Sequence, residues 1–569
     1  MRNVLSLLTG APNRIFLTRG DFTNLYLANG IRPVGVLDFA RGVYVGSGGR
    51  VSDAEDVFTY SDGSGKTMFD ATGTLVTVAQ GTPRYNSHVY ENGSWVNKGL
   101  LIESEARTNL ITDNSDISGR TLSSAVLVPN YAGSPLGPNT AIRLIDNEST
   151  GAGQVYMATP VVNVAVASSY TYYGVFKADQ ETVVAIATWN FTTPDNTPSY
   201  FDLFAGTVQS TNTGHTAHMS PLGNGWYLCG ITFTTDATDT SGEIRVYVAD
   251  ENLSVDHDGT SSILFAYDQF EAGSTPSSYI PTSGSTVTRA AETAVIEPAN
   301  NPLLTAGVNI IANGTFDTTV DEWSDTTSTG TGGISWSGGK MVLVCDNTSN
   351  RARASQAIST VIGRRYLATY NSTQNHHFRA GLAENGTANL SILNEGSGEK
   401  AHYFIASATT TFVTFEGFNP SASQPHIDNV SVIPLSMPDA LSIGMKGTMT
   451  GASSTFINWT ADADNGLLVQ SGASDLTFTQ EAVTVVDTVT GGTYTSGINV
   501  PFNIASRHGA TFINGAVDGT ALTADLTPTA LADLSAVNFQ IGPTFMGHIQ
   551  ELPLYADNVA DIGLEEITA

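Results

Sequence analysis

The side chains best suited to ligand chemistry in this sequence are aromatic residues between positions 323 and 379, with amide and charged residues close by. Flat aromatic rings pack against the C–H faces of pyranose sugars, while a few polar groups bind the hydroxyls. We therefore predict a carbohydrate-binding site here. For any one aromatic residue, a place in a hydrophobic core is the alternative. The predicted site consists of Trp323, Trp336, Tyr370, His376, Phe378 and Arg379, and Trp189, Tyr200 and Tyr247 form a similar group earlier in the chain.

Residues arranged for catalysis are not found in the sequence. The triplet Asp256-His257-Asp258 lies in a polar stretch before Gly259, which is typical of a solvated turn. His376 and His377 are adjacent, so in a strand they point to opposite faces and are poorly placed to share a metal ion. A serine-nucleophile elbow, an H-E-x-x-H helix and a complete phosphate-binding loop are all missing. The sequence therefore predicts no catalytic residues and no enzyme.

The composition indicates an all-β protein. The 569 residues include 56 glycines and only 14% charged residues, and Thr, Ser, Asn and Val are abundant. Long windows with the 3.6-residue period of an amphipathic helix are missing, although residues 561–568 are compatible with a short helix. The hydrophobic content of 41% can supply several cores. The length alone suggests about four domains.

The chain is strongly acidic. With 53 acidic and 24 basic residues, its formal charge is −29. Phosphate groups are bound by Lys and Arg, so this balance argues against nucleic acid or an anionic bilayer as a partner. No stretch approaches the roughly 20 apolar residues of a membrane helix, and the apolar run at positions 4–8 is too short for a secretory signal. We expect no nucleic-acid binding and no membrane insertion.

The chain contains two cysteines, Cys229 and Cys345, which lie in separate parts of the sequence. This number and spacing argue against a disulfide framework and against a cysteine-based zinc site. Each cysteine is expected to be a small buried apolar residue.

Two motifs bracket one part of the chain. The opening motif, residues 99–111, reads GLLIESEARTNLI, and the closing motif, residues 278–292, reads SYIPTSGSTVTRAAE. Pro281 lacks a backbone donor and holds Ile280 extended, so a short apolar strand before it would end there. We interpret the closing motif as a clasp that completes the β-module begun by the opening motif.

Alternating patterns predict individual strands. In residues 243–250, Ile244, Val246 and Val248 alternate with Arg245 and Tyr247, as in a half-buried strand. Residues 34–39, 74–78 and 547–555 also read as strands.

Proline-bearing joints at 297–302 and 434–438 separate these segments into modules. We predict an irregular N-terminal anchor followed by three β-sandwich modules. The predicted boundaries are 1–98 for the anchor, and 99–297, 303–435 and 439–569 for the sandwiches.

The opening and closing motifs, with Phe201-Asp202-Leu203 and Gly225-Trp226-Tyr227 between them, resemble a module of tailed-bacteriophage virion proteins. In that module a GLLIE…RTNL segment precedes a jelly roll that ends in SYIPT…TRA. The resemblance implies a tail fibre, baseplate spike or head fibre. It also implies a homotrimer located in the virion, the bacteriophage particle, after assembly in the host cytoplasm.

The part from 303 to 435 resembles the jelly-roll carbohydrate-binding modules of polysaccharide-degrading enzymes. The match is carried by Asn313 to Asp317, Trp323, Ser335-Trp336, Gln356 and Asp428-Asn429-Val430. In such modules a calcium ion often joins the first strand to the last, which implies structural calcium held by Asp317 and Asp428, since oxygen ligands suit this cation. Alternatively, Asp317 caps a turn and Asp428 is solvated. Asp116 and Glu271 form an analogous pair with weaker support.

The last part resembles a laminin-G or concanavalin-like lectin sandwich at residues 502–507, 514–519 and 541–549. Together the resemblances imply a virion protein whose residues 1–98 bind other virion proteins and whose sandwiches bind a host cell-surface glycan. The alternatives are a polysaccharide depolymerase or glycosidase with accessory binding modules, and a purely structural capsid decoration protein. The sandwiches leave no stretch for a catalytic barrel or β-helix, which disfavours the depolymerase.

Overall fold

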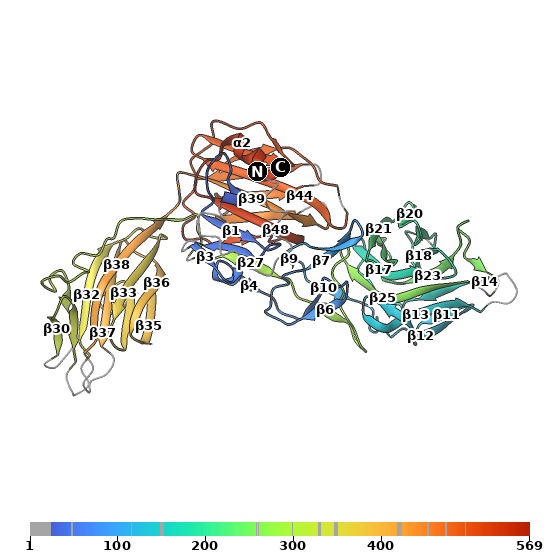
Figure 1. Ribbon diagram of the computed structural model, residues 1–569, viewed down its shortest axis with the longest axis horizontal. Coiled ribbons are helices and arrows are strands. Elements are labelled where there is room, and N and C mark those ends of the chain that lie inside the picture. The colour runs from blue at the N-terminus through green and yellow to red at the C-terminus, as the bar shows by residue number, and fades with distance from the viewer. Residues whose placement is uncertain are drawn as a thin grey trace, which may run out of the picture.

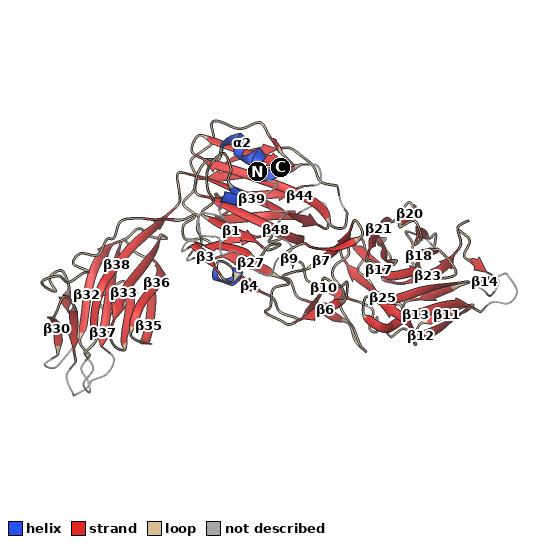
Figure 2. Cartoon of the chain, viewed as in Figure 1, coloured by secondary structure: helices blue, strands red, loops and turns tan. Residues whose placement is uncertain are grey.

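A computed structural model shows an elongated molecule whose regular secondary structure is almost entirely β-strand, which confirms the predicted all-β class (Figures 1 and 2). The described part of the chain forms three β-sandwiches. One lies at the centre of the molecule, and the others lie to either side of it. The structure describes residues 24–46, 49–114, 116–147, 153–194, 196–257, 259, 261–298, 300–327, 332–345, 351–417, 424–451, 454–472, 475–495 and 497–569.

The central unit, sandwich C, combines strands from both halves of the sequence. Its nine-stranded sheet contains, in spatial order, β3 (Gly49–Val51), β2 (Val43–Gly46), β1 (Gly35–Asp38), β48 (Met546–Tyr555), β39 (Ala440–Met449), β44 (Val500–Gly509), β45 (Phe512–Val517) and β46 (Thr520–Ala521), with β9 (Leu100–Glu103) beside β48. Its seven-stranded sheet contains β4 (Thr59–Ser61), β27 (Thr293–Ile296), β47 (Phe539–Ile541), β40 (Ser454–Asp462), β41 (Asn465–Ser471), β42 (Leu476–Ala482) and β43 (Val485–Thr490).

This arrangement corrects the predicted division of the chain at residues 98 and 439. The strand predicted at 34–39 exists as β1, but it pairs with β48, where Val36 lies opposite Pro553. All four residues of β1 are buried, and Leu37 belongs to the same core as Leu554. Strands β1 to β4 of the N-terminal region therefore complete the C-terminal sandwich, whereas Phe69 and Leu75 pack against the cluster of sandwich A that contains Tyr173 and Trp226. The first 23 residues of the predicted anchor lie outside the described residues.

Sandwich A is inserted between β9 and β27. Its seven-stranded sheet contains β11 (Thr121–Ser123), β15 (Tyr156–Ala158), β23 (Ser241–Ala249), β18 (Val183–Trp189), β19 (Ser199–Asp202) and β20 (Thr207–Ser210), with β16 (Val162–Asn163) beside β23. Its six-stranded sheet contains β12 (Ala125–Ser134), β13 (Gly137–Asp146), β25 (Ser262–Ala272), β17 (Ser169–Ala178), β22 (Trp226–Thr234) and β21 (Thr216–Pro221). Two short ladders join β10 (Arg107–Asn109) to β26 (Val287–Arg289) and β14 (Gly153–Gln154) to β24 (Asp256–His257).

Sandwich B is inserted between β27 and β39, and its strands lie between residues 305 and 436. One sheet contains β30 (Gly333–Trp336), β31 (Met341–Val344), β38 (His426–Ser436), β33 (Arg365–Ser372) and β36 (Gly398–Ile405), with β28 (Thr305–Ala306) beside β38. The five-stranded sheet contains β29 (Ser324–Asp325), β32 (Arg353–Ser359), β37 (Thr410–Gly417), β34 (His376–Gly381) and β35 (Leu390–Glu395).

Small elements complete the fold. Two hairpins, β5 (Lys66–Phe69) with β6 (Leu75–Val78) and β7 (His88–Glu91) with β8 (Ser94–Asn97), belong to the N-terminal part of the chain. The predicted tail helix is confirmed as α2 (Ala560–Thr568), which packs on β44 and β45. The described residues also form two 3-10 turns, η2 (Asn24–Tyr26) and η3 (Ala54–Asp56). None of the helices in the described ranges has the length and apolar character required to cross a membrane.

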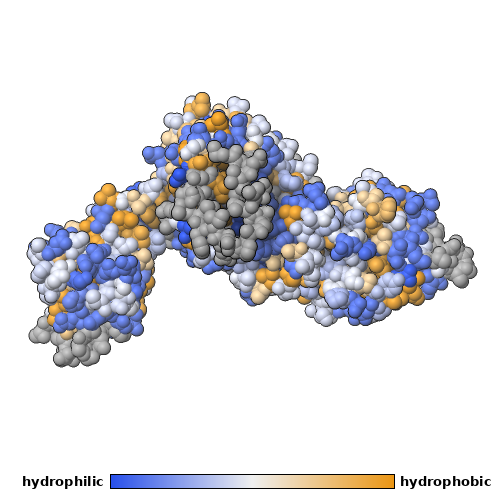
Figure 3. Space-filling model, in the orientation of Figure 1, coloured by the Kyte–Doolittle hydropathy of each residue, from blue (hydrophilic) through white to orange (hydrophobic). Residues whose placement is uncertain are grey.

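Each sandwich has its own hydrophobic core. Cys229 lies in the core of sandwich A and Cys345 in that of sandwich B, and both are buried, as predicted. The face visible in Figure 3 shows hydrophilic residues interspersed with small hydrophobic patches.

The opening and closing motifs meet as predicted. Strands β10 and β26 pair, with Arg107 opposite Arg289. The short strand expected before Pro281 does not form. Instead the Ile280 N–H donates to the Gln269 side chain (2.7 Å), and its carbonyl accepts from Asn109 (3.0 Å). Amide side chains thus replace the ladder bonds that a strand would supply.

The turn between β42 and β43 is strained. Val483 and Thr484 have φ angles of 51° and 70°, although β-branched residues rarely adopt left-handed backbone. The turn joins directly paired residues, Ala482 and Val485, and Asn-Gly is the preferred pair for such a hairpin.

We expect Val483→Asn combined with Thr484→Gly to raise the free energy of unfolding of sandwich C by about 1–2 kcal/mol. Chemical denaturation followed by far-UV circular dichroism measures the change. Val485→Asn, at an exposed position outside the turn, serves as control and should give no gain. If the denaturation midpoint of the turn variant equals that of the unsubstituted protein, the inference that this turn is strained is wrong.

Candidate functional site

Three of the residues predicted to bind carbohydrate lie in the core of sandwich B. Trp323 is 6% exposed, Tyr370 is 2% exposed and Phe378 is fully buried. Trp323 and Tyr370 both pack on Phe415 at the centre of this core. Their ring faces are therefore covered by protein, and the alternative assignment to the core applies to all three.

His376 and Arg379 are also buried, in different surroundings. His376 faces the core, and its Nε2 lies 3.0 Å from the Tyr370 hydroxyl. Burial lowers the pKa of His376, so its imidazole is neutral at pH 7. Arg379 lies on the opposite face of β34 from the core and forms an ion pair with Glu416.

Trp336 is the exposed member of the predicted set. Its side chain is 44% exposed at the edge of sandwich B, and its indole N–H donates to the Phe316 carbonyl (2.6 Å). The predicted calcium ligands are not brought together with further ligands. Asp317 is exposed, and Asp428 pairs with Lys340 at 3.0 Å. Among the described residues, no group of three or more His, Cys, Asp or Glu side chains is placed to hold a metal ion.

The structure instead assembles an aromatic surface on sandwich A, on the outer side of the seven-stranded sheet. We call this surface the aromatic face. It consists of Tyr156, Trp189, Tyr200, Arg245 and Tyr247. Four of the five side chains are partly exposed, and Tyr247 is 3% exposed.

Strand register explains why these residues meet. Tyr247 of β23 lies opposite Tyr156 of β15 on one side and Ala185 of β18 on the other. Ala185 in turn lies opposite Tyr200 of β19. One row across four strands therefore reads Tyr, Tyr, Ala, Tyr, and the small alanine leaves space between its large neighbours. Ile244 and Val246 point into the core from the other side of β23.

Arg245 organises the centre of the aromatic face. Its guanidinium carbon lies 3.3 Å from the ring centroid of Trp189 and 4.4 Å from that of Tyr156. Its Nε donates to Glu243 Oε1 at 3.0 Å. The cation is thus held by two ring faces and one carboxylate, an arrangement that stacking and cation–π attraction favour. The surface offers aromatic area beside a charged donor and acceptor, which is the combination that binds sugars.

The tyrosines of this face keep their protons at neutral pH. Burial raises the pKa of Tyr200, and the nearby Asp250 charge adds to the effect. Burial also raises the pKa of Tyr247. Both phenols are therefore neutral hydroxyl groups that can donate or accept hydrogen bonds.

The sequence contained part of this site. Trp189, Tyr200 and Tyr247 were candidates by residue type, and the alternation over 243–250 placed Arg245 on the same side of the strand as Tyr247. Tyr156 could not be found in this way, because its neighbours in space come from another strand. The triplet Asp256-His257-Asp258 contributes β24, while Asp258 lies outside the described residues.

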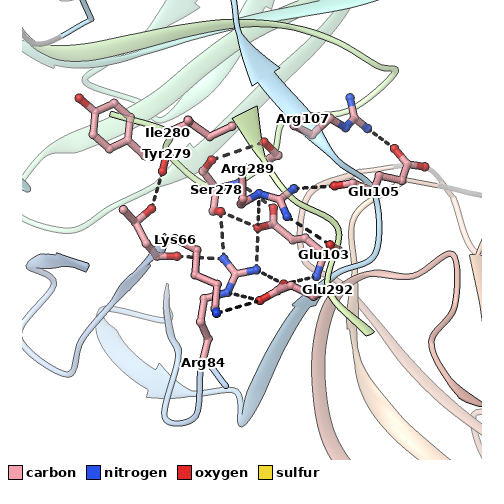
Figure 4. Close-up of polar contacts among 12 residues, drawn as sticks. Lys66, Arg84, Glu103, Glu105, Arg107, Ser278, Tyr279, Ile280, Arg289 and Glu292 are labelled. Atoms are coloured by element: carbon pink, nitrogen blue, oxygen red, sulfur yellow. Dashed lines mark hydrogen bonds and ion pairs between the residues drawn. The ribbon is translucent and has the colours of Figure 1, made fainter. Parts of the chain in front are cut away.

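A buried ionic network lies where sandwiches A and C meet (Figure 4). Arg84 Nη2 lies 2.7 Å from Glu103 Oε2, and its Nε donates to Glu292 Oε1 at 3.1 Å. Its Nη1 donates to the Ser278 hydroxyl at 2.9 Å. Arg289 Nε lies 3.3 Å from the same Glu103 oxygen. The opening and closing motifs are thus joined by charged side chains as well as by backbone pairing.

Two hollows flank this network and share Thr450 and Met546. One, of about 130 Å³, is lined mainly by apolar and aromatic residues, including Trp95 and Tyr279. The other, of about 480 Å³, is lined mainly by hydroxyl-bearing and charged residues, including Arg107. Both lie at the junction of the two sandwiches, away from the aromatic face.

No protein-family model matches the chain, and a search of curated proteins finds no significant match.

Proposed function

We propose that this chain is a structural protein of a tailed-bacteriophage virion, a tail fibre, baseplate spike or head fibre, that attaches to glycans on the host surface. The observation that carries the binding function is the aromatic face, where Trp189, Tyr156 and Arg245 stack together at the surface of sandwich A. The paired motifs at 99–111 and 278–292 support the assignment to a virion. Other virion proteins would bind through the N-terminal region.

Several copies of the aromatic face on one particle would strengthen attachment. A homotrimer, as the resemblance to phage proteins implies, presents three such faces to a polysaccharide whose units repeat. Weak sites that are physically linked bind at high effective concentration, so modest affinity at each face is sufficient.

We expect Trp189→Ala to weaken glycan binding by the full chain about tenfold or more. The substitution removes the ring and also the support for Arg245, and cation–π contacts of this kind contribute about 1–2 kcal/mol, where 1.4 kcal/mol corresponds to a factor of ten. Binding is measured on an array of bacterial surface polysaccharides and then by titration with the best ligand.

Trp336→Ala is the matched control, because it removes a partly exposed tryptophan from a different sandwich. It should bind as the unsubstituted protein does. Loss of binding in this variant alone would move the site to sandwich B. Absence of binding to any surface polysaccharide, or release of reducing ends from one, would contradict the proposal.

A further inference from the structure

We propose that the side chains of Lys66 and Asp62 join through an amide bond, which forms within the folded chain without an external enzyme. Lys66 is the first residue of β5, and Asp62 lies in the loop between β4 and β5. Figure 4 shows Lys66 beside Glu292 at the buried ionic network. The bond closes residues 62–66 into a ring. It is independent of the proposed glycan-binding function.

The two groups that react are in contact in the interior. Lys66 Nζ forms an ion pair with Asp62 Oδ2, and both side chains are 1% exposed. The loop between them is held against the closing motif, because the Ser64 hydroxyl accepts a hydrogen bond from the Ala290 N–H at 2.8 Å. Well-oriented groups within one molecule react as if each were present at about 10⁵–10⁸ M. This site therefore favours a reaction that free lysine and aspartate do not undergo at neutral pH.

Lys66 is suited to be the nucleophile. Burial lowers the pKa of its ammonium group from 10.5 to about 8. The charge of Glu292 opposes this shift, and the guanidinium groups of Arg84 and Arg289 add to it. A larger fraction of neutral amine is therefore present at neutral pH than in an exposed lysine. The neutral amine is the form that attacks a carbonyl carbon.

The carboxyl group of Asp62 receives a hydrogen bond at each oxygen. The Gly81 N–H donates to Oδ1 at 2.8 Å, and the Tyr60 hydroxyl donates to Oδ2 at 3.0 Å. The Gly81 donor stabilises the negative charge that develops on Oδ1 when nitrogen attacks, as the donors of an oxyanion hole do. The Tyr60 hydroxyl faces the oxygen that leaves. Asp62 is therefore held as an electrophile.

Glu292 completes the site as the proton acceptor. Its side chain is fully buried, and its Oε1 lies 4.0 Å from Lys66 Nζ and accepts from the Tyr60 hydroxyl at 2.5 Å. Tyr60 thus bridges Glu292 and Asp62. Burial raises the pKa of this phenol, and the Glu292 charge adds to the effect, so the hydroxyl keeps its proton at neutral pH. A path for protons therefore runs from the ammonium group through Glu292 and Tyr60 to the leaving oxygen.

The reaction is a condensation that releases one water molecule. Glu292 takes a proton from the Lys66 ammonium group, and Tyr60 passes a proton to Asp62 Oδ2, which converts the carboxylate into a carboxylic acid. Lys66 Nζ attacks Cγ, a C–N bond forms, and the Cγ–Oδ2 bond breaks. Nitrogen loses a second proton to the departing hydroxide, so the products are a neutral amide and water. No oxidant, reductant or co-reactant is consumed. Two charges disappear from the interior, where their desolvation is costly.

The test is mass spectrometry of the full chain, intact and after tryptic digestion in denaturant. We expect an intact mass that is lower than the sequence mass by one water molecule. We also expect one tryptic peptide covering residues 51–84, because trypsin does not cleave after a lysine whose amine is acylated. Fragmentation should locate the loss within residues 62–66.

Lys66→Arg keeps the positive charge but has no amine, so it should have the full sequence mass. This variant also detects loss of water at Asp62-Gly63 by attack of the backbone N–H, which needs no lysine. Tyr60→Phe keeps the ring that lies 5.0 Å from Lys66 Nζ and removes the proton path. Its linked form should accumulate about 100-fold more slowly after synthesis.

Lys98→Arg is the control, since it changes a lysine of the same N-terminal region that pairs with Glu91. It should be linked as completely as the unsubstituted protein. The full sequence mass in the unsubstituted protein, with cleavage after Lys66, would overturn the proposal whether or not the variants fold. A loss of water that persists in Lys66→Arg would also overturn it. Linkage of Tyr60→Phe at the rate of the unsubstituted protein would exclude Tyr60 from the reaction.

Discussion

Replacing Arg84 by methionine is expected to lower the free energy of unfolding by about 3–5 kcal/mol, the cost of breaking a buried ion pair by removing one partner. The Arg84 side chain is fully buried and bridges Glu103 and Glu292. Without the guanidinium group, the carboxylates of Glu103 and Glu292 remain in the interior with less positive charge to stabilise them. Methionine keeps much of the volume, so the loss reports the charge and the hydrogen bonds.

The effect should be concentrated at the junction of sandwiches A and C. Arg84 also donates to the carbonyl of Thr67 at 2.9 Å and to Ser278, so it ties β5 to the closing motif. Hydrogen–deuterium exchange should show faster exchange in residues 59–103 and 276–292 than in sandwich B, which is distant from the network (Figure 1). Chemical denaturation of the full chain measures the accompanying decrease in the free energy of unfolding.

Arg364→Met is the control for this experiment, because it removes a partly exposed ion pair with Asp533. Such pairs contribute about 0–1 kcal/mol. Adding Glu292→Leu to Arg84→Met should recover part of the loss, since replacing a whole buried pair by apolar residues is far less costly than removing one partner. A loss below 1 kcal/mol in Arg84→Met would show that the network does not stabilise the junction.

Sandwich C is expected to lose stability as the pH falls from 7 toward 4.5, through two buried histidines. Burial lowers the pKa of His508 and of His548 from 6.5 to about 3. At pH values between about 3 and 6.5, the unfolded chain binds more protons than the folded chain. The free energy of unfolding therefore decreases as the pH falls through this range. At about pH 4.5 the loss relative to pH 7 is about 2.5 kcal/mol for each histidine.

Protonation of Glu103 causes a second loss of stability at lower pH. Burial alone raises the pKa of its carboxyl, but the guanidinium groups of Arg289 and Arg84 outweigh this and hold the pKa far below its usual value. A carboxylate with a depressed pKa contributes its full stabilisation above its unfolded pKa of 4.5. That contribution is lost as the pH falls from there, below the range in which the histidines act.

The measurement is a series of denaturation curves between pH 4.5 and pH 7.5. His548→Gln removes the titrating group but retains a polar partner for Ser87, which lies 3.0 Å from His548 Nε2. The variant should show a shallower dependence on pH, whatever its stability at pH 7. His402→Gln in sandwich B is the comparison, because its partly exposed ring lies beside Glu395 outside sandwich C. Identical slopes for the unsubstituted protein and His548→Gln would contradict the prediction.

The sequence by itself determined the all-β class, the buried cysteines, the tail helix and several strands, including 34–39 and 243–250. These features depend on composition and on short-range periodicity, which a chain carries locally. It also indicated that the motifs at 99–111 and 278–292 belong together, and β10 and β26 confirm this. Residue types alone suggested Trp189, Tyr200 and Tyr247 as ligand-binding candidates.

Tertiary structure alone decided which aromatic residues reach the surface. Alternation along a strand separates two faces, but it does not say which strands become neighbours or which face is covered. Trp323 and Trp336 look alike in the sequence, yet one lies in a core and the other at an edge. The pairing of β1 with β48 joins opposite ends of the chain. Pairings across such separations arise because distant strands bury each other's apolar faces, and local sequence does not record that choice.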